Sequence, residues 1–275
     1  METGGYVTGF GKTHRTDAWW IGPLSVAGGL TLWLIYYMWA ALQAQDFTYG
    51  PYLSPFYSPL LIAPEGASAL VESHAWLAGS WDHWFANWWP SFLPQSPALL
   101  IFIFPATFRA SCYYYRKAYY RSMFGTPPGC AVGPVPQKNY KGETGMLVLQ
   151  NVHRYTLYFA LALLPFLYYD AIMAFVYEGR IGVGVGAVMV LINAALLTGY
   201  TLGCHAWRHL IGGKLDCFTC TATSRLRFSL WKPSTWFNGR HQQFAWASLI
   251  WIAITDMYIR LCAQGAITDL NTWGI

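Results

Sequence analysis

The chain has 275 residues, of which 55% are hydrophobic, 18% are aromatic and only 11% are charged. Soluble domains carry roughly 25% charged residues, so this composition excludes an ordinary soluble protein and favours one embedded in lipid. The formal net charge of +5 could suit a nucleic-acid-binding protein, but the positions of the cations, described below, argue against that class.

Five apolar stretches are long enough to cross a bilayer as helices, at about residues 18–44, 97–119, 146–177, 181–210 and 241–263. The first stretch is too long for a secretory signal peptide, and no small-residue cleavage site follows it. We therefore predict an all-α membrane protein with five transmembrane helices, forming a single domain over residues 1–275.

The lysines and arginines predict the orientation of these helices. Of the 17 Lys and Arg residues, only Arg180 and Arg260 fall at the ends assigned to the outside. The others precede the first span or surround the connections between spans two and three and between spans four and five. Cytoplasmic connections carry the excess of Lys and Arg, so we expect a cytoplasmic N-terminus and an external C-terminus. The basic inner face then suits docking of protein partners, and we expect no nucleic-acid partner.

The connection between the first two spans, residues 45–95, has no Lys or Arg and is rich in proline and tryptophan. We expect a long outer loop that serves as a structural lid.

Three ionisable residues are expected at membrane depth, where such side chains are candidates for function. Arg109 lies in the second span, and His153 and Arg154 lie about two turns into the third. His153 could be a haem ligand, a hydrogen-bond donor to quinone, or a metal ligand.

A stronger motif follows the fourth span. His205 and His209 are four residues apart, which places both imidazoles on one face of a helix. Cys217 and Cys220 follow with a spacing at which two thiolates can bind one metal. On the predicted topology these cysteines face the cytoplasm, where thiols stay reduced. The four residues His205, His209, Cys217 and Cys220 therefore predict a metal site.

Three kinds of metal centre fit two histidines and two cysteines. Tetrahedral zinc would be structural. A b-type haem would need His153 together with His205 or His209, because two histidines on one helix face cannot ligate a haem from opposite sides. A Rieske-type [2Fe–2S] cluster has two cysteines on one iron and two histidines on the other. A site at the membrane favours electron transfer over a purely structural role.

With its five spans and the motif from His205 to Cys220 at the inner face, the chain resembles the membrane-anchor subunit of respiratory complex II, succinate dehydrogenase. It resembles in particular the haem-free branch with a Rieske-type [2Fe–2S] cluster in the anchor. Soluble Rieske motifs each contribute one Cys and one His, whereas here the residues come as a His pair and a Cys pair. Cys204 and His153 are the alternative ligands.

The resemblance implies a subunit of succinate:quinone oxidoreductase, an enzyme of the tricarboxylic acid cycle, in the bacterial plasma membrane. Flavoprotein and iron–sulfur subunits would oxidise succinate on the cytoplasmic side, and this chain would hold no catalytic residues of its own. Electrons would pass through the cluster to menaquinone or another quinone, bound by His153, Arg154 and Arg109. The alternatives are an anchor that binds haem b and a zinc-stabilised membrane scaffold without a redox role.

Overall fold

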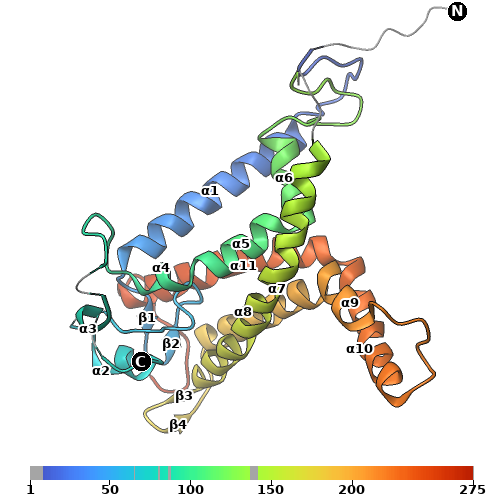
Figure 1. Ribbon diagram of the computed structural model, residues 1–275. Helices are drawn as coiled ribbons and strands as arrows, with labels where there is room; N and C mark the ends of the chain where they lie inside the picture. Colours follow the sequence, from blue (N-terminus) through green and yellow to red (C-terminus); the bar gives the residue numbers. More distant parts are fainter. Residues whose placement is uncertain (1–8, 65, 80, 86–87, 137–141, 275) are drawn as a thin grey trace, which may run out of the picture.

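The computed structural model describes residues 9–64, 66–79, 81–85, 88–136 and 142–274, and it is largely helical (Figure 1). Four of the described helices are long and apolar enough to span a membrane, at Ile21–Gln43, Asn151–Met173, Val185–Leu202 and His241–Ala263. The class of the fold is therefore confirmed, whereas the number of spans and their orientation remain predictions.

Two long helices agree closely with the predicted spans. Helix α1 covers Ile21–Gln43 and helix α11 covers His241–Ala263. Most of α1 has large apolar side chains on its surface, among them Leu24, Leu32 and Ile35, as expected for a helix that contacts lipid. Helix α11 is more buried and packs against α8, Val185–Leu202.

The second predicted span is not one helix. It divides into α4 (Pro97–Ile101), α5 (Ile103–Ser111) and α6 (Tyr113–Ser122). At Cys112 the backbone is extended, with φ −62° and ψ 135°. The break frees carbonyls at the end of α5, and the Tyr119 hydroxyl donates to one of them, the Ala110 oxygen, at 2.9 Å. The apolar sequence predicted one continuous helix, but the helix is interrupted at Cys112, and a side-chain hydrogen bond satisfies a carbonyl at the interruption.

The third and fourth predicted spans also have different ends. Helix α7 covers Gly142–Met173 and leads into the hairpin of β3 (Val176–Tyr177) and β4 (Arg180–Ile181). Helix α8 ends at Leu202, so the two histidines of the motif belong to a separate helix, α9 (His205–Gly212). With α10 (Ala222–Gly239), α9 forms a hairpin that projects from the other helices (Figure 1).

Residues 45–95 cover one end of the helices. They contain the antiparallel strands β1 (Thr48–Tyr49) and β2 (Tyr52–Leu53) and the short helices α2 (Ala69–Ser73) and α3 (Trp81–Phe85). Tyr57 and Leu60 from this connection are fully buried against the end of α1. The connection is thus part of the core and more than a loop.

The two ends of the helix bundle differ in charge. The carboxylate end, where α1 and α7 finish, carries Asp46, Asp170, Asp256 and Asp269. The basic end, where α1 and α7 begin, carries Arg121, Arg154, Arg208, Lys214 and Arg240.

Candidate functional site

Two cysteines lie at helix breaks at the basic end. Cys112 separates α5 from α6, and Cys204 separates α8 from α9. Their backbones have nearly the same conformation, with φ −62° and ψ 135° at Cys112 and φ −64° and ψ 140° at Cys204. Both side chains belong to one buried cluster. Each break turns a thiol into the space between the helices.

Two histidines from other helices face these thiols. The Nε2 atom of His153, on α7, lies 3.0 Å from the Cys204 sulfur. The Nε2 atom of His241, the first residue of α11, lies 3.6 Å from the Cys112 sulfur. The exposed fractions are 1% for Cys112, 8% for His153, 2% for Cys204 and 3% for His241. The two pairs adjoin, because Phe108, which stacks on His153, contacts the ring of Tyr200, which stacks on His241. We call the two cysteines and the two histidines the donor cluster.

Aromatic rings and a hydroxyl hold the imidazoles in place. His153 stacks on Phe108, and its Nδ1 atom lies 3.0 Å from the Ser111 hydroxyl. His241 stacks on Tyr200 with 4.9 Å between the ring centroids. Two buried polar atoms here, His241 Nδ1 and the Tyr200 hydroxyl oxygen, have no hydrogen-bond partner. Orphaned buried polar atoms are rare in folded proteins, so these two are candidates for contact with a bound group.

The motif residues predicted as metal ligands lie elsewhere. His205 and His209 are exposed on α9, and Cys217 and Cys220 are joined by a disulfide in the loop before α10. Among the described residues, no three His, Cys, Asp or Glu side chains form a group that could hold a single metal ion. The structure therefore does not bring the four predicted ligands together, since Cys217 and Cys220 are bonded to each other in the loop that follows α9.

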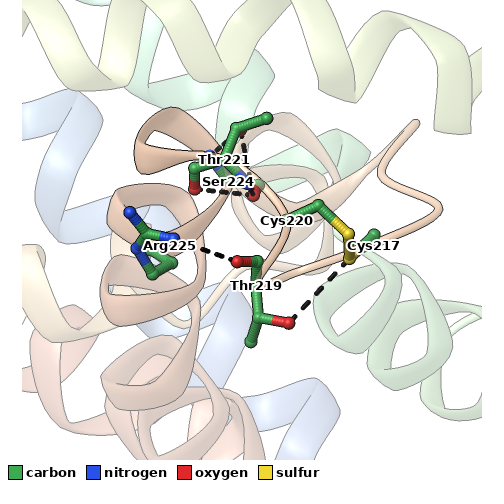
Figure 2. The surroundings of a disulfide bond; sticks show 6 residues. All are labelled: Cys217, Thr219, Cys220, Thr221, Ser224 and Arg225. Atoms are coloured by element: carbon green, nitrogen blue, oxygen red, sulfur yellow. Dashed lines mark hydrogen bonds between the residues drawn. A yellow bond between two sulfur atoms is a disulfide. The ribbon is translucent and has the colours of Figure 1, made fainter.

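Figure 2 shows how the disulfide loop is attached to α10. The Thr221 hydroxyl oxygen caps this helix by accepting a hydrogen bond from the Ser224 N–H at 3.1 Å. The Ser224 hydroxyl oxygen accepts the Thr221 N–H in return, which completes a capping box. Arg225 donates to the Thr219 carbonyl at 3.1 Å. Sulfurs in a disulfide are not thiolates, so Cys217 and Cys220 cannot ligate a metal in this form.

Arg109, predicted to bind quinone, borders a large apolar cavity of about 360 Å³. Its guanidinium donates to the hydroxyls of Tyr115 and of Ser248, the latter at 3.1 Å. None of the three ion pairs among the described residues includes it. The walls come mainly from four regions of the bundle, represented by Leu30, Trp33, Ile101, Pro105, Leu163, Leu167, Leu249 and Ile252.

Arg154, also predicted to bind quinone, lies in a different place. It lines a smaller pocket of about 290 Å³ together with His209, Lys214 and Arg227. His153 points into the donor cluster instead. The three residues predicted for quinone binding are thus divided among three neighbouring sites.

Comparison with known proteins identifies the family. Residues 21–265 match the family described as actinobacterial succinate dehydrogenase subunit SdhC. The chain belongs to this family. A solved structure, the Mycobacterium smegmatis Sdh1 complex in the apo form, contains a similar chain with 37% sequence identity and a TM-score of 0.79. The similarity covers 95% of this chain and 98% of that one. No curated protein matches.

As a succinate dehydrogenase anchor, the chain is a multi-pass protein of the bacterial plasma membrane and part of an enzyme complex. Catalysis takes place on partner chains, the flavoprotein and iron–sulfur subunits. The predicted membrane-anchor subunit of complex II, its two soluble partner subunits and its location are therefore confirmed.

Sequence reasoning named His153 and Cys204 as metal ligands only in reserve, with His153 also predicted to bind quinone, and it gave Cys112 and His241 no role. The available signal was depth in the membrane: His241 begins the fifth span at the same end at which His153 enters the third. Lone residues 129 positions apart produce no spacing motif that could be recognised.

Proposed function

We propose that this anchor subunit carries electrons from the iron–sulfur subunit to membrane quinone through a Rieske-type [2Fe–2S] cluster. The cluster would be bound by Cys112, His153, Cys204 and His241 and not by the four residues of the α9 motif. The observation that carries the proposal is the donor cluster itself, two thiols and two imidazoles buried together at the junction of the helices.

The chemistry of the donors fits this group. A Rieske-type centre takes two thiolates and two imidazole nitrogens, and the donor cluster offers two Sγ and two Nε2 atoms. A two-iron cluster distributes its ligands over two metal atoms, so it does not need the tight group that one ion requires. When bound, it supplies one-electron transfer at a potential raised by imidazole ligation.

The surrounding residues suit a ligating role for both histidines. A ligating histidine commonly uses its second ring nitrogen in a hydrogen bond that fixes the ring, and the Ser111 hydroxyl lies at hydrogen-bond distance from Nδ1 of His153. Stacking on Phe108 and Tyr200 excludes water from both imidazoles. At Cys204 the sulfur also accepts the Ala206 N–H at 3.3 Å, a bond that would stabilise a thiolate.

The apolar cavity beside Arg109 is the proposed quinone site. Ligand pockets combine apolar walls with a few polar groups that fix orientation, and Arg109 is the charged residue among the described residues that line this cavity. Its guanidinium can donate to a quinone carbonyl, while its bonds to Tyr115 and Ser248 hold it in position.

A short aromatic path joins the cavity to the donor cluster. Tyr115 lines the cavity, and its ring lies 5.9 Å from that of Tyr200. Tyr200 in turn stacks on His241. The guanidinium of Arg109 lies 4.9 Å from the centre of the Tyr200 ring. The proposed donor and acceptor of electrons are therefore separated by packed side chains and not by lipid.

Low-temperature EPR of the reduced, purified complex tests the proposal. Mixed His and Cys ligation lowers the average g-value of a [2Fe–2S] centre, a signal that neither haem nor zinc produces. We expect His241→Ala and Cys112→Ser to abolish this signal and quinone reduction, while succinate oxidation with a soluble dye continues on the partner subunits.

The α9 motif provides the matched control. The paired variants His205→Ala/His209→Ala and Cys217→Ser/Cys220→Ser should keep the signal and quinone reduction. If these variants lose the signal and His241→Ala keeps it, the cluster ligands would be the residues of the α9 motif. A reduced haem spectrum in place of the EPR signal would support the haem-binding anchor instead.

A further inference from the structure

A second, chemically different pocket lies between α7 and the α9–α10 hairpin. It has a volume of about 290 Å³. Arg154 and Tyr158 line it from α7, His209 and Leu210 from α9, and Lys214 and Arg227 from the chain that follows. The donor cluster and the apolar cavity do not include these side chains, so neither accounts for the pocket.

The charge of this pocket is one-sided. Arginines, a lysine and a histidine line it, and no acidic side chain of the described residues does so. The three ion pairs found in the described part of the chain involve other residues. Such a concentration of cations is unfavourable unless an anion accompanies it.

Arg227 shows that the pocket is held in a defined shape. Its Nε atom donates to the Ile211 carbonyl at 2.7 Å, and one terminal nitrogen donates to the Gly213 carbonyl at 2.8 Å. These bonds close the end of α9 against α10. They also fix the guanidinium beside the pocket, because an arginine bound through two nitrogens loses most of its freedom.

The position of the pocket indicates the source of the anion. Arg154 lies near the start of the candidate span Asn151–Met173, and Leu157 and Tyr158 form an apolar wall about one turn deeper into that span. Cations at the boundary of a span with apolar side chains below them match the two parts of a lipid, its headgroup and its acyl chains.

We propose that this pocket binds the phosphate group of an anionic phospholipid. The phosphate would contact Arg154, Lys214 and the guanidinium of Arg227, and the acyl chains would descend along α7. Basic pockets between transmembrane helices are known sites for such headgroups. The inference does not depend on the proposed iron–sulfur cluster or on the quinone site.

Native mass spectrometry of the whole complex in detergent tests the proposal. The complex is titrated with phosphatidylglycerol, and in parallel with phosphatidylcholine and with inorganic phosphate. We expect phosphatidylglycerol to bind most tightly, and the double variant Arg154→Gln/Lys214→Gln to weaken its binding about thirtyfold. Lys214→Gln alone, a change in an exposed loop residue that leaves the helices intact, should weaken it about fivefold.

The matched control removes the same charge outside the pocket. Lys232→Gln/Arg240→Gln changes two exposed cations of the neighbouring region and should leave the affinity within about twofold. Equal weakening by both double variants would overturn the proposal, since general surface charge would then explain the binding. Inorganic phosphate that binds as tightly as the lipid would overturn the lipid as source. If the variant Arg154→Gln/Lys214→Gln loses the iron–sulfur subunit but binds the lipid as before, the pocket would be a contact with that subunit instead.

Discussion

The two ends of the helix bundle treat their polar groups differently. At the carboxylate end, Asp256 accepts from Arg260 at 2.8 Å and from Tyr36 at 2.6 Å. Arg260 donates in addition to the carbonyls of Gln45 and Ala40. Both members of this ion pair are almost completely buried. At the basic end, by contrast, the Tyr200 hydroxyl and His241 Nδ1 have no partners.

This contrast separates polar groups that stabilise the fold from polar groups that are available to bind a partner. Buried charges are tolerated where protein groups satisfy them, and the carboxylate end largely meets that condition within the chain. The basic end carries a set of sulfur and nitrogen donors and a cationic pocket, and the apolar cavity extends from Tyr119 toward Phe56 and Ser58 near the other end. Such features suit binding partners from outside the chain. The exceptions include the buried Oδ1 atom of Asp170 and the buried Nε1 atom of Trp81, which also have no partner.

The largest effect is expected from breaking the ion pair at the carboxylate end. Asp256→Ala leaves the Arg260 guanidinium buried without its counter-charge, and removing one partner of a buried pair costs about 3–5 kcal/mol. The thermal unfolding of the purified complex should shift strongly downward. As a control, Arg180→Gln removes an exposed pair with Glu178, whose contribution should be at most about 1 kcal/mol. Equal shifts in the two variants would contradict the assignment.

An intermediate effect is expected at the helix break that carries Cys204. A Cβ atom at Gly203 would lie 2.8 Å from the Gly199 carbonyl oxygen and 2.9 Å from that of Phe237. Since both contacts are backbone, Gly203→Ala should destabilise the fold by about 1–3 kcal/mol and move Cys204 relative to His153. Thermal unfolding and the EPR signal measure the two consequences.

Gly28 on α1 is the matched control for this substitution. A Cβ atom there meets nothing within 4 Å, and alanine is favoured over glycine inside a helix by about 1 kcal/mol. Gly28→Ala should therefore leave stability unchanged or raise it. If Gly203→Ala also raises stability, the close packing at this break is not as described.

The smallest effect is expected at Tyr200, whose unbonded hydroxyl contrasts with the bonded hydroxyl of Tyr52. The Tyr52 hydroxyl at the carboxylate end donates to Asp269 at 2.7 Å, so Tyr52→Phe should cost about 1–3 kcal/mol. The Tyr200 hydroxyl has no partner, so Tyr200→Phe should leave stability unchanged or raise it slightly. Thermal unfolding of both variants measures the difference. A cost at Tyr200 would mean that its hydroxyl is bonded in the assembled complex.

Composition and apolar length alone predicted an all-α membrane protein, and they located α1 and α11 closely, because burial in lipid requires long runs of apolar residues. They failed at the second span, where apolarity continues through a break at Cys112, and at the end of the fourth, where the chain turns at Gly203. Local hydrophobicity indicates which segments can lie in the membrane, but close packing against other helices decides whether each segment stays helical.

The motif from His205 to Cys220 led to the correct family but not to the donor cluster. Spacing rules detect ligands that one helix or one turn brings together, as in this motif. The donor cluster is assembled from α7, α11 and two helix breaks, and its members are separated by up to 129 residues. Only the tertiary structure could bring them together, because their proximity depends on how the helices pack and not on their distance along the chain.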